Sequence, residues 1–329
     1  MSVQDATGAI VILAYPEEFV SMIPAWYRKP MEWLGMVNEG KICVGHSAMA
    51  LINKATGVIH YADFGRYITP FGYGRTRMVK SDPDVAFDYT VVFDEDGFIV
   101  DKIALFEHIF QHPEKTHGGD SMFVSLNQNI DFDSCFNFIS TMNAKGSIKY
   151  DPFGKDASNC SRFVFDAILA GMKLSFERKR LKRKSPLTAS PLANVFYGTD
   201  DDSYEFTPSG ANIVTDKSLK KIVSYFFKKP TPTSVMKDEF QPTENMSFLG
   251  GVGDQAYFKL DEIVQGDKAI VTKLDKNGHK TFTHSYRLTS DFDPKAPFKF
   301  VHDSNAAWIT IEQKNKRFRF ERFDEVVKE

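Results

Sequence analysis

Cysteine is scarce in this chain: its 329 residues contain three, Cys43, Cys135 and Cys160. Three scattered thiols are too few for a disulfide framework, and no Cys-X-X-Cys pair suggests a zinc site. A reduced compartment fits this usage best. Each thiol must therefore be explained by packing or by reactivity.

Long apolar runs and an excess of one charge are also lacking. No run approaches the roughly 20 residues that a membrane helix needs. The formal net charge is −2, so no global basic field indicates nucleic acid or an anionic membrane as the main partner. The N-terminal "MSVQDATGAIVILAYPEEF" has no basic region and predicts a strand, not a signal peptide. We expect a cytoplasmic chain without nucleic-acid partner or membrane insertion, and export by a dedicated system stays open.

Aromatic residues, in contrast, are abundant: they make up 14% of the chain and include 30 phenylalanines. This content indicates a heavily packed interior, part of which could line an apolar substrate groove. The length favours two domains over one.

The first half of the chain alternates strand and helix signals. Apolar β-rich residues predict a strand over 9–16, and two apolar runs around "NKATG" predict a β-hairpin within 41–67. Helices are expected over 101–112 and over 131–146, where Asp and Gly provide the capping chemistry. A further strand is expected over 121–128.

Other segments give weaker signals. We expect short strands at 88–95 and 97–100, helices at 160–170 and 215–229, and a solvated basic connector over 173–186.

From about residue 230, apolar and polar residues alternate between turn signals such as "DKNG" and "DSN". This pattern predicts a small all-β module. The sequence therefore predicts an α+β protein with two domains, at residues 1–228 and 229–329. The first would hold an antiparallel sheet with packed helices.

Cys160 stands at the start of a predicted apolar helix, in "KDASNCSRFVFDAILAGM". A helix N-terminus favours the thiolate through its unpaired N–H groups and its dipole, and Ser158 or Asn159 is a natural N-cap. Helix-terminal N–H groups can also hold an oxyanion in acyl transfer. The plainer alternative is that Cys160 is a small buried residue.

A thiol nucleophile needs an imidazole base, which the hairpin can supply. His46 begins its first strand, and His60 lies on the returning strand. If Ile52 pairs with Val58 across the loop, His46 and His60 share one face. Asp63 would then point away unless a bulge intervenes. His60 is therefore the expected orienting group, with Asp63 in reserve.

These stretches resemble a known family. "NCSRFVFDAI" is similar to the nucleophile motif of NlpC-type papain-like peptidases, and "GHSAMALINKATGVIHYADFG" looks like their histidine strand. In those enzymes the cysteine precedes the histidine, whereas here the order is reversed. Reversal marks the circularly permuted branch, which includes YiiX-like hydrolases and lecithin retinol acyltransferase-like proteins. The resemblance covers about residues 8–200.

The resemblance implies a permuted papain-like domain in which Cys160 is the nucleophile, His46 the general base and His60 the third polar member. It also implies Tyr150 and Ser161 as supporting residues at the oxyanion site.

Arg162 departs from the family pattern, because many relatives have Gly there. It predicts a bulkier, positively charged groove wall, which suits a substrate carrying a carboxylate.

The implied activity is that of a cysteine peptidase or amidase acting through an acyl-enzyme, with no metal or organic cofactor. Its partner would be a peptide, amide or acyl substrate in a cleft. An acyltransferase or thioesterase acting on lipid is an alternative, as is a non-catalytic protein that binds peptide or lipid. The oligomeric state stays open.

A histidine-rich segment offers a competing interpretation. His108, His112, His117 and Asp120 could bind zinc, because a His pair at i, i+4 lies on one helix face. However, Glu107 precedes the first His, so the HExxH pattern is absent. A polar helix end with a surface loop is the favoured interpretation.

Overall fold

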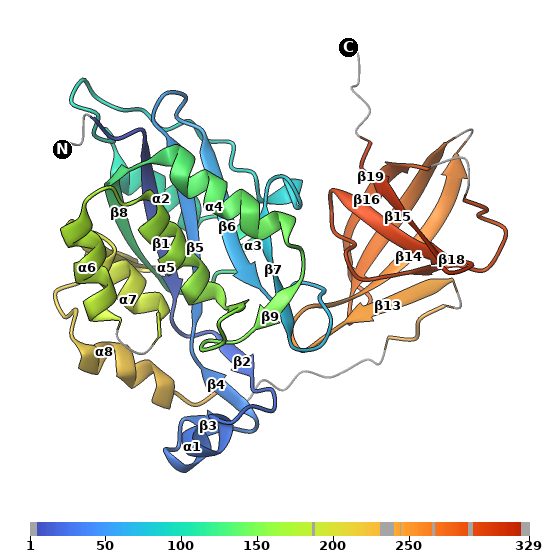
Figure 1. The fold of residues 1–329 in the computed structure, drawn as a ribbon, viewed down its shortest axis with the longest axis horizontal. Helices are drawn as coiled ribbons and strands as arrows, with labels where there is room; N and C mark the ends of the chain where they lie inside the picture. Colours follow the sequence, from blue (N-terminus) through green and yellow to red (C-terminus); the bar gives the residue numbers. More distant parts are fainter. Residues whose placement is uncertain are drawn as a thin grey trace.

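The computed structural model describes residues 5–323 except 186–187, 231–239, 244, 265–266 and 289–291. It has the predicted α+β architecture: one large sheet covered by helices, followed by separate small β-sheets (Figure 1).

The large sheet has nine strands, and neighbouring strands are antiparallel except for the parallel pair β9 and β10. In order across the sheet they are β10 (Ala157–Ser158), β9 (Ile148–Tyr150), β7 (Tyr73–Met78), β6 (Ile59–Gly65), β5 (His46–Asn53), β1 (Gly8–Tyr15), β8 (Met122–Ile130), β11 (Ser203–Thr207) and β12 (Gly210–Ile213).

Helices accompany this sheet and its small neighbour. The α-helices are α1 (Arg28–Trp33), α2 (Lys102–Phe110), α3 (Pro113–Thr116), α4 (Phe132–Ala144), α5 (Cys160–Gly171), α6 (Ser175–Lys184), α7 (Pro191–Tyr197) and α8 (Leu219–Ser224). Two 3-10 helices are η2 (Pro83–Val85) and η3 (Tyr225–Phe227). A small sheet beside α1 contains β2 (Phe19–Ser21), β4 (Lys41–Cys43) and β3 (Val37–Asn38).

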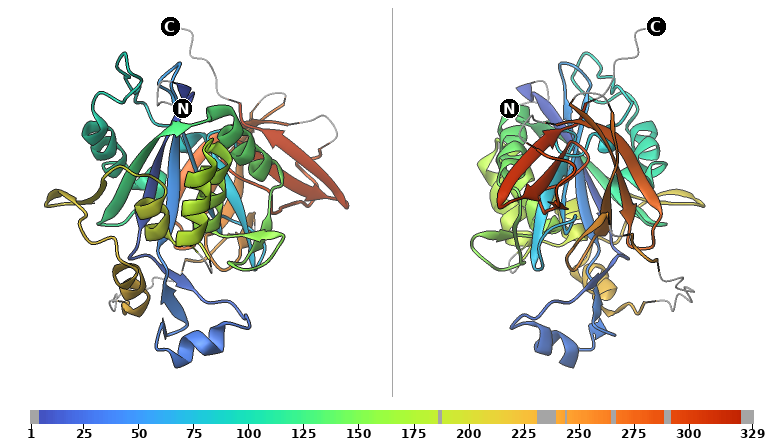
Figure 2. Two further views of the ribbon diagram at one scale, coloured as in Figure 1. Left: turned by 60° about the vertical axis from the view of Figure 1, so that its left-hand side comes forward. Right: turned by 90° about the vertical axis from the view of Figure 1, so that its right-hand side faces the viewer.

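The central strand β1 is buried along its whole length because both faces of the sheet are covered. Its Ile10 and Ile12 face the core beneath α4, α5 and α7. Val11 and Leu13 face the opposite core, where α2 packs. Figure 2 shows the helices on either side of the sheet.

The C-terminal part confirms the predicted all-β module. Its strands form two sheets, β13 (Met246–Gly250), β14 (Gln255–Val264), β15 (Lys268–Asp275) and β16 (Lys280–Arg287), and β17 (Lys299–Phe300), β18 (Trp308–Gln313) and β19 (Lys316–Glu321). Phe258, Tyr286 and Phe320 fill the core between them. The boundary at 228/229 stays a prediction, and residues 231–239 lie outside the described part.

The module docks on the loops around β7. The Asp254 amide donates to the Arg66 carbonyl at 2.9 Å, and the Ala307 amide donates to the Ser81 carbonyl at 3.2 Å. Ile68 is buried in the core of the module. Backbone hydrogen bonds and apolar burial therefore join the two parts.

The predicted hairpin is present, but its predicted register was wrong by one residue. Ile52 pairs with Ile59, not with Val58. The Asn53 amide donates to the Val58 carbonyl at 3.1 Å, and the Gly57 amide donates to the Asn53 carbonyl at 2.8 Å. The loop thus has four residues rather than five, which reverses which residues of β6 share a face with His46.

The two weaker strand predictions were wrong. The segments at 88–95 and 97–100 hold isolated bridges and no strand, with Phe93 bridged to Ile99. The expected solvated connector at 173–186 contains α6, whose Leu181 is buried while Lys179, Lys182, Arg183 and Lys184 are exposed. Arg178 stabilises this helix start by donating to the Met172 carbonyl at 3.1 Å.

Gly57 should be the residue of the hairpin loop that least tolerates a side chain. Its φ is +68°, and a Cβ there would lie 2.3 Å from the Val91 carbonyl oxygen. Gly72 has φ +81° but open space around it. In urea denaturation we expect Gly72→Ala to cost about 1–2 kcal/mol, from backbone strain. Gly57→Ala should cost about 1–3 kcal/mol more, from the clash. Equal losses would mean that the clash does not operate.

Candidate functional site

Cys160 is the first residue of α5, and the residues around it fix it there. Asn159 caps the helix, because its side chain accepts from the Arg162 amide at 2.9 Å. Phe163 and Val164 anchor the first turn in the core. Cys160 lies at the end of α5 that faces the start of β5. The residue is only 5% exposed, so its thiol is not freely accessible.

The surroundings of Cys160 favour its thiolate. Burial alone would raise the pKa of the thiol, but the hydrogen bond and charge of the His46 imidazole oppose this. The Tyr150 hydroxyl, 3.6 Å from Sγ, and the Ser47 amide also donate to the sulfur. Together they lower the pKa of Cys160 to about 7. The other two thiols differ, because burial raises the pKa of Cys43 to about 11 and that of Cys135 to about 12.

His46 is the first residue of β5 and lies between Cys160 and a carboxylate. Its Nε2 donates to Asp63 Oδ2 at 3.4 Å, which leaves Nδ1 as the ring nitrogen for the thiol. The ring stacks on Tyr15 of β1, with centroids 6.4 Å apart. Burial would lower the pKa of His46, but Asp63 and Cys160 raise it to about 9. The imidazole is therefore held in the form that can pair with a thiolate.

Asp63 is completely buried and heavily hydrogen-bonded. Its Oδ2 accepts from Tyr61 Oη at 2.7 Å, Tyr67 Oη at 2.9 Å and Arg77 Nη2 at 2.6 Å, and its Oδ1 accepts from Arg77 Nε at 3.2 Å. Burial would raise the pKa of this carboxyl, but the Arg77 charge and the His46 contact hold it well below its usual range. Asp63 is thus an anion that points at His46.

His60 lies elsewhere, which corrects the expected shared face. With Ile52 opposite Ile59, Leu51 pairs with His60 and Ala48 with Asp63. His60 packs against Phe132 and Phe136, at ring-centroid distances of 5.3 and 5.1 Å. Burial lowers the pKa of His60. The residue kept in reserve, Asp63, occupies the position beside His46.

The two supporting residues lie beside the thiol. Tyr150 belongs to β9, and the Arg66 guanidinium covers its ring at 4.4 Å. Ser161 Oγ is 3.8 Å from Cys160 Sγ. The Ser161 carbonyl accepts from Asn194 Nδ2 at 2.8 Å, which ties α5 to α7.

Arg162 is hydrogen-bonded to the loop before Cys160. Its Nη1 donates to the carbonyls of Asp151 and Gly154, at 3.2 and 2.8 Å. The guanidinium therefore holds this loop in place, and the positively charged groove wall stays a prediction.

An aromatic cluster forms around Phe153 in the loop before Cys160. Phe153 packs against Trp26 and Tyr27, with ring centroids 5.6 and 5.4 Å away. Trp26 is 75% exposed, so part of the aromatic content does reach the surface near the site.

The sequence did not single out the residues that hold Asp63. Arg77 lies in "YGRTRM", where basic residues alternate with small ones along a strand, and Tyr61 precedes Asp63 by the two-residue period of a strand. Both patterns could have indicated that Arg77 and Tyr61 lie beside Asp63. His117 was considered as a metal ligand, but its ring stacks on Tyr67 at 5.3 Å, and burial lowers its pKa to about 3.

The histidine-rich segment is not arranged around one metal position. The rings of His108 and His112 pack against each other at a tilt of 44° with centroids 4.5 Å apart, whereas His117 stacks on Tyr67. Within the described ranges, no group of three His, Cys, Asp or Glu side chains could hold a metal ion. In the same ranges, no helix is long and apolar enough to cross a membrane.

Comparisons with known proteins gave matches for both parts of the chain. Residues 246–323 match the family model described as the DUF6695 C-terminal domain. A crystal structure of the type VI secretion system effector TseH resembles the chain with a TM-score of 0.42 and 16% identity, over 63% of this chain and 97% of that one. A comparison with curated proteins gave no significant match.

The N-terminal part gives the family. Residues 10–175, just over half of the chain, match the model described as "Type VI secretion system effector TseH-like". This range contains the hairpin, β7 and the start of α5, and so all the residues around Cys160. The chain therefore belongs to the TseH-like family of type VI secretion system effectors.

Proposed function

We propose that the chain is a thiol-dependent hydrolase of the papain-like class, with a circularly permuted order of motifs. The observation that carries this proposal is the pairing of Cys160 with His46, which lowers the pKa of a buried thiol to about 7. A packing cysteine has no such partner, as Cys135 illustrates. Family membership supports the hydrolase class, and it supports the dedicated export that the sequence leaves open.

The proposed roles follow from the contacts. Cys160 is the nucleophile, His46 the general acid and base, and Asp63 the group that orients the imidazole, in place of His60. The N–H groups of Cys160 and Ser161 have no intrahelical acceptor in the first turn, so with the Tyr150 hydroxyl they can hold an oxyanion.

The reaction would run in two halves. The Cys160 thiolate attacks the carbonyl carbon of an amide or ester, and a C–S bond forms as the oxygen becomes an oxyanion. The bond to the leaving nitrogen or oxygen breaks as the His46 imidazolium gives it a proton. Water then attacks the thioester while His46 takes its proton, and the C–S bond breaks, which releases the acid and restores the Cys160 thiolate beside the His46 imidazolium.

Alkylation by iodoacetamide should separate Cys160 from the other thiols. Because the pKa of Cys160 is about 7, it should react fastest near neutral pH, well before Cys43 and Cys135. In His46→Ala the apparent pKa of Cys160 should rise, because the positive charge that opposes the effect of burial is removed. Mass spectrometry across a pH series measures all three sites. Equal inertness of Cys160 and Cys135 would support the binding-protein alternative.

Asp63, and not His60, should orient the imidazole. With p-nitrophenyl acetate as probe, we expect Asp63→Asn to slow acylation of Cys160 by about a hundredfold, because His46 loses its charged partner. His60→Asn should stay within about threefold of the parent. The Cys160 pKa, read by alkylation, should rise in Asp63→Asn alone. Thermal unfolding of both variants checks that they fold. A large loss in His60→Asn with no change in Asp63→Asn would reverse the assignment.

A plot of the acylation rate against pH should be bell-shaped. It should rise as pH passes about 7, where Cys160 loses its proton, and fall as pH passes about 9, where His46 loses the proton needed by the leaving group. Stopped-flow release of p-nitroaniline from an acyl p-nitroanilide, whose amine must be protonated to leave, measures the profile from pH 5 to 10. A rate that keeps rising above pH 9 would argue against His46 as proton donor.

A further inference from the structure

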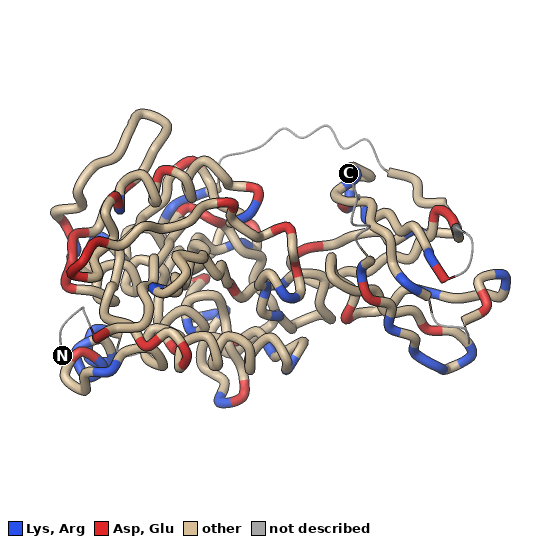
Figure 3. The backbone as a smooth tube through the Cα atoms, turned by 90° about the horizontal axis from the view of Figure 1, so that it is seen from above, with Lys and Arg blue, Asp and Glu red and all other residues tan. Residues whose placement is uncertain are grey.

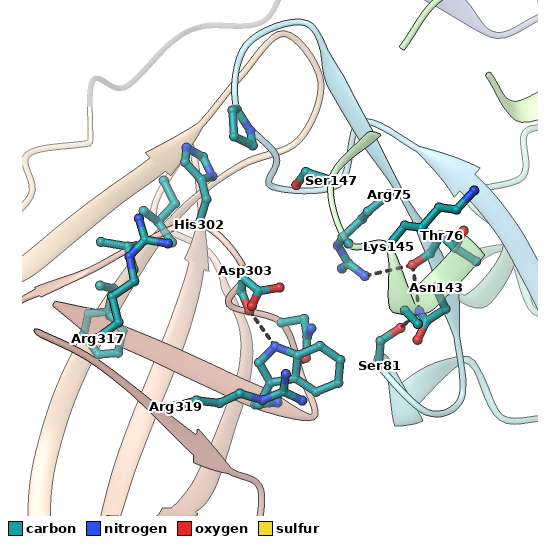
Figure 4. Close-up of a pocket in the computed structure, with 18 of the residues that line it drawn as sticks. Arg75, Thr76, Ser81, Asn143, Lys145, Ser147, His302, Asp303, Arg317 and Arg319 are labelled. Carbon is teal, nitrogen blue, oxygen red and sulfur yellow. Dashed lines mark hydrogen bonds between the residues drawn. The ribbon is translucent and has the colours of Figure 1, made fainter. Parts of the chain in front are cut away.

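A cleft of about 950 Å³ lies between β7, the end of α4 and the sheet β17–β19 of the C-terminal module. Figure 4 shows its two walls: Arg75 and Lys145 extend from one, and His302, Arg317 and Arg319 from the other. Neither Cys160 nor His46 lines it. The cleft is therefore a feature separate from the thiol site.

The cleft carries a local surplus of positive charge. Six of its lining side chains are Lys or Arg and two are Asp or Glu. Over the chain as a whole, acidic and basic positions are interspersed (Figure 3), and the net charge is −2. The surplus of positive charge is thus a property of the cleft and not of the whole chain.

The charges are only partly neutralised within the walls, since Arg75 pairs with Asp82 at 2.7 Å and Arg319 pairs with Glu321 at 2.8 Å. Lys80 and Lys145 have no carboxylate partner in the part of the chain that the structure describes. Across the cleft, Lys299 and Arg317 share the single carboxylate of Glu312, at 2.8 and 3.7 Å. Positive charge therefore exceeds negative charge among the lining side chains, and an anion in the cleft would be attracted by the excess.

Polar and apolar groups add to this basic lining. The Thr76 hydroxyl is buried without a hydrogen-bond partner among the described residues, and Thr76 lines the cleft. Phe248, on the rim, is 52% exposed.

We propose that this cleft binds an acidic peptide segment of a protein partner. Carboxylates would meet the lysines and arginines of both walls, and apolar side chains between them would pack on Phe248 and Pro70. A strand of evenly spaced phosphates fits less well, because Glu312 and the apolar rim interrupt the basic surface. The volume is sufficient for several peptide residues.

The test uses the full chain and a fluorescein-labelled peptide in which glutamates alternate with Leu and Gly. Anisotropy titration should show binding that weakens with added salt, and no binding of the matching Gln peptide. Lys80→Glu/Lys145→Glu and, separately, Arg317→Glu should each weaken binding by about tenfold or more. The matched control is Lys179→Glu/Lys220→Glu, which makes the same charge change at exposed sites on α6 and α8 and should stay within about twofold.

Three results would overturn the proposal. They are no binding of the Glu peptide, equal losses in the cleft and control variants, and tighter binding of a single-stranded oligonucleotide with the same sensitivity to Lys80→Glu/Lys145→Glu. The last result would assign the cleft to phosphodiesters. Unfolding temperatures of all variants distinguish loss of the cleft from loss of the fold.

Discussion

The buried ion pair between Asp63 and Arg77 is the interaction on which the thiol site depends. A carboxylate without exposure costs several kcal/mol unless it is paired and hydrogen-bonded. Arg77, Tyr61 and Tyr67 supply these partners, and Arg77 also donates to the Lys115 carbonyl at 2.8 Å. The pair thereby ties β6 to β7 and to α3. The ion pair also leaves a charged oxygen of Asp63 facing His46. This oxygen raises the pKa of the imidazole, and the charged imidazole favours the Cys160 thiolate.

Much of the site was predictable because its signals are local. The N-cap at Asn159, the helix behind Cys160 and the strand that begins at His46 follow from residues close in sequence. The third member was not predictable, because strand parity depends on whether the loop holds four or five residues. "NKATG" permits either, and the left-handed conformation of Gly57 together with the pairing of Asn53 and Val58 decides it.

Long-range packing explains the other differences. The apolar residues at 88–100 suit strands, yet in the fold they cover the face of the large sheet beside α2, and Val91 and Ile99 are buried there without ladder partners. The basic run forms α6 because Leu181 reaches the main core and anchors one side of the helix. Neither outcome can be calculated from local propensity, since each depends on a surface built by residues far along the chain.

Strand β7 connects the thiol site with the basic cleft, and it also keeps them separable. Arg75 belongs to both: it lines the cleft, pairs with Asp82 at 2.7 Å, and donates to the Tyr67 carbonyl at 3.0 Å, while the Tyr67 hydroxyl donates to Asp63. Removing Arg75 would disturb both places at once. Lys80 follows β7 and Lys145 ends α4, and neither contacts the residues around Asp63 in the described structure. The charge of the cleft can therefore change while the buried ion pair is preserved, so the binding proposed there and the hydrolysis proposed at Cys160 can be tested separately.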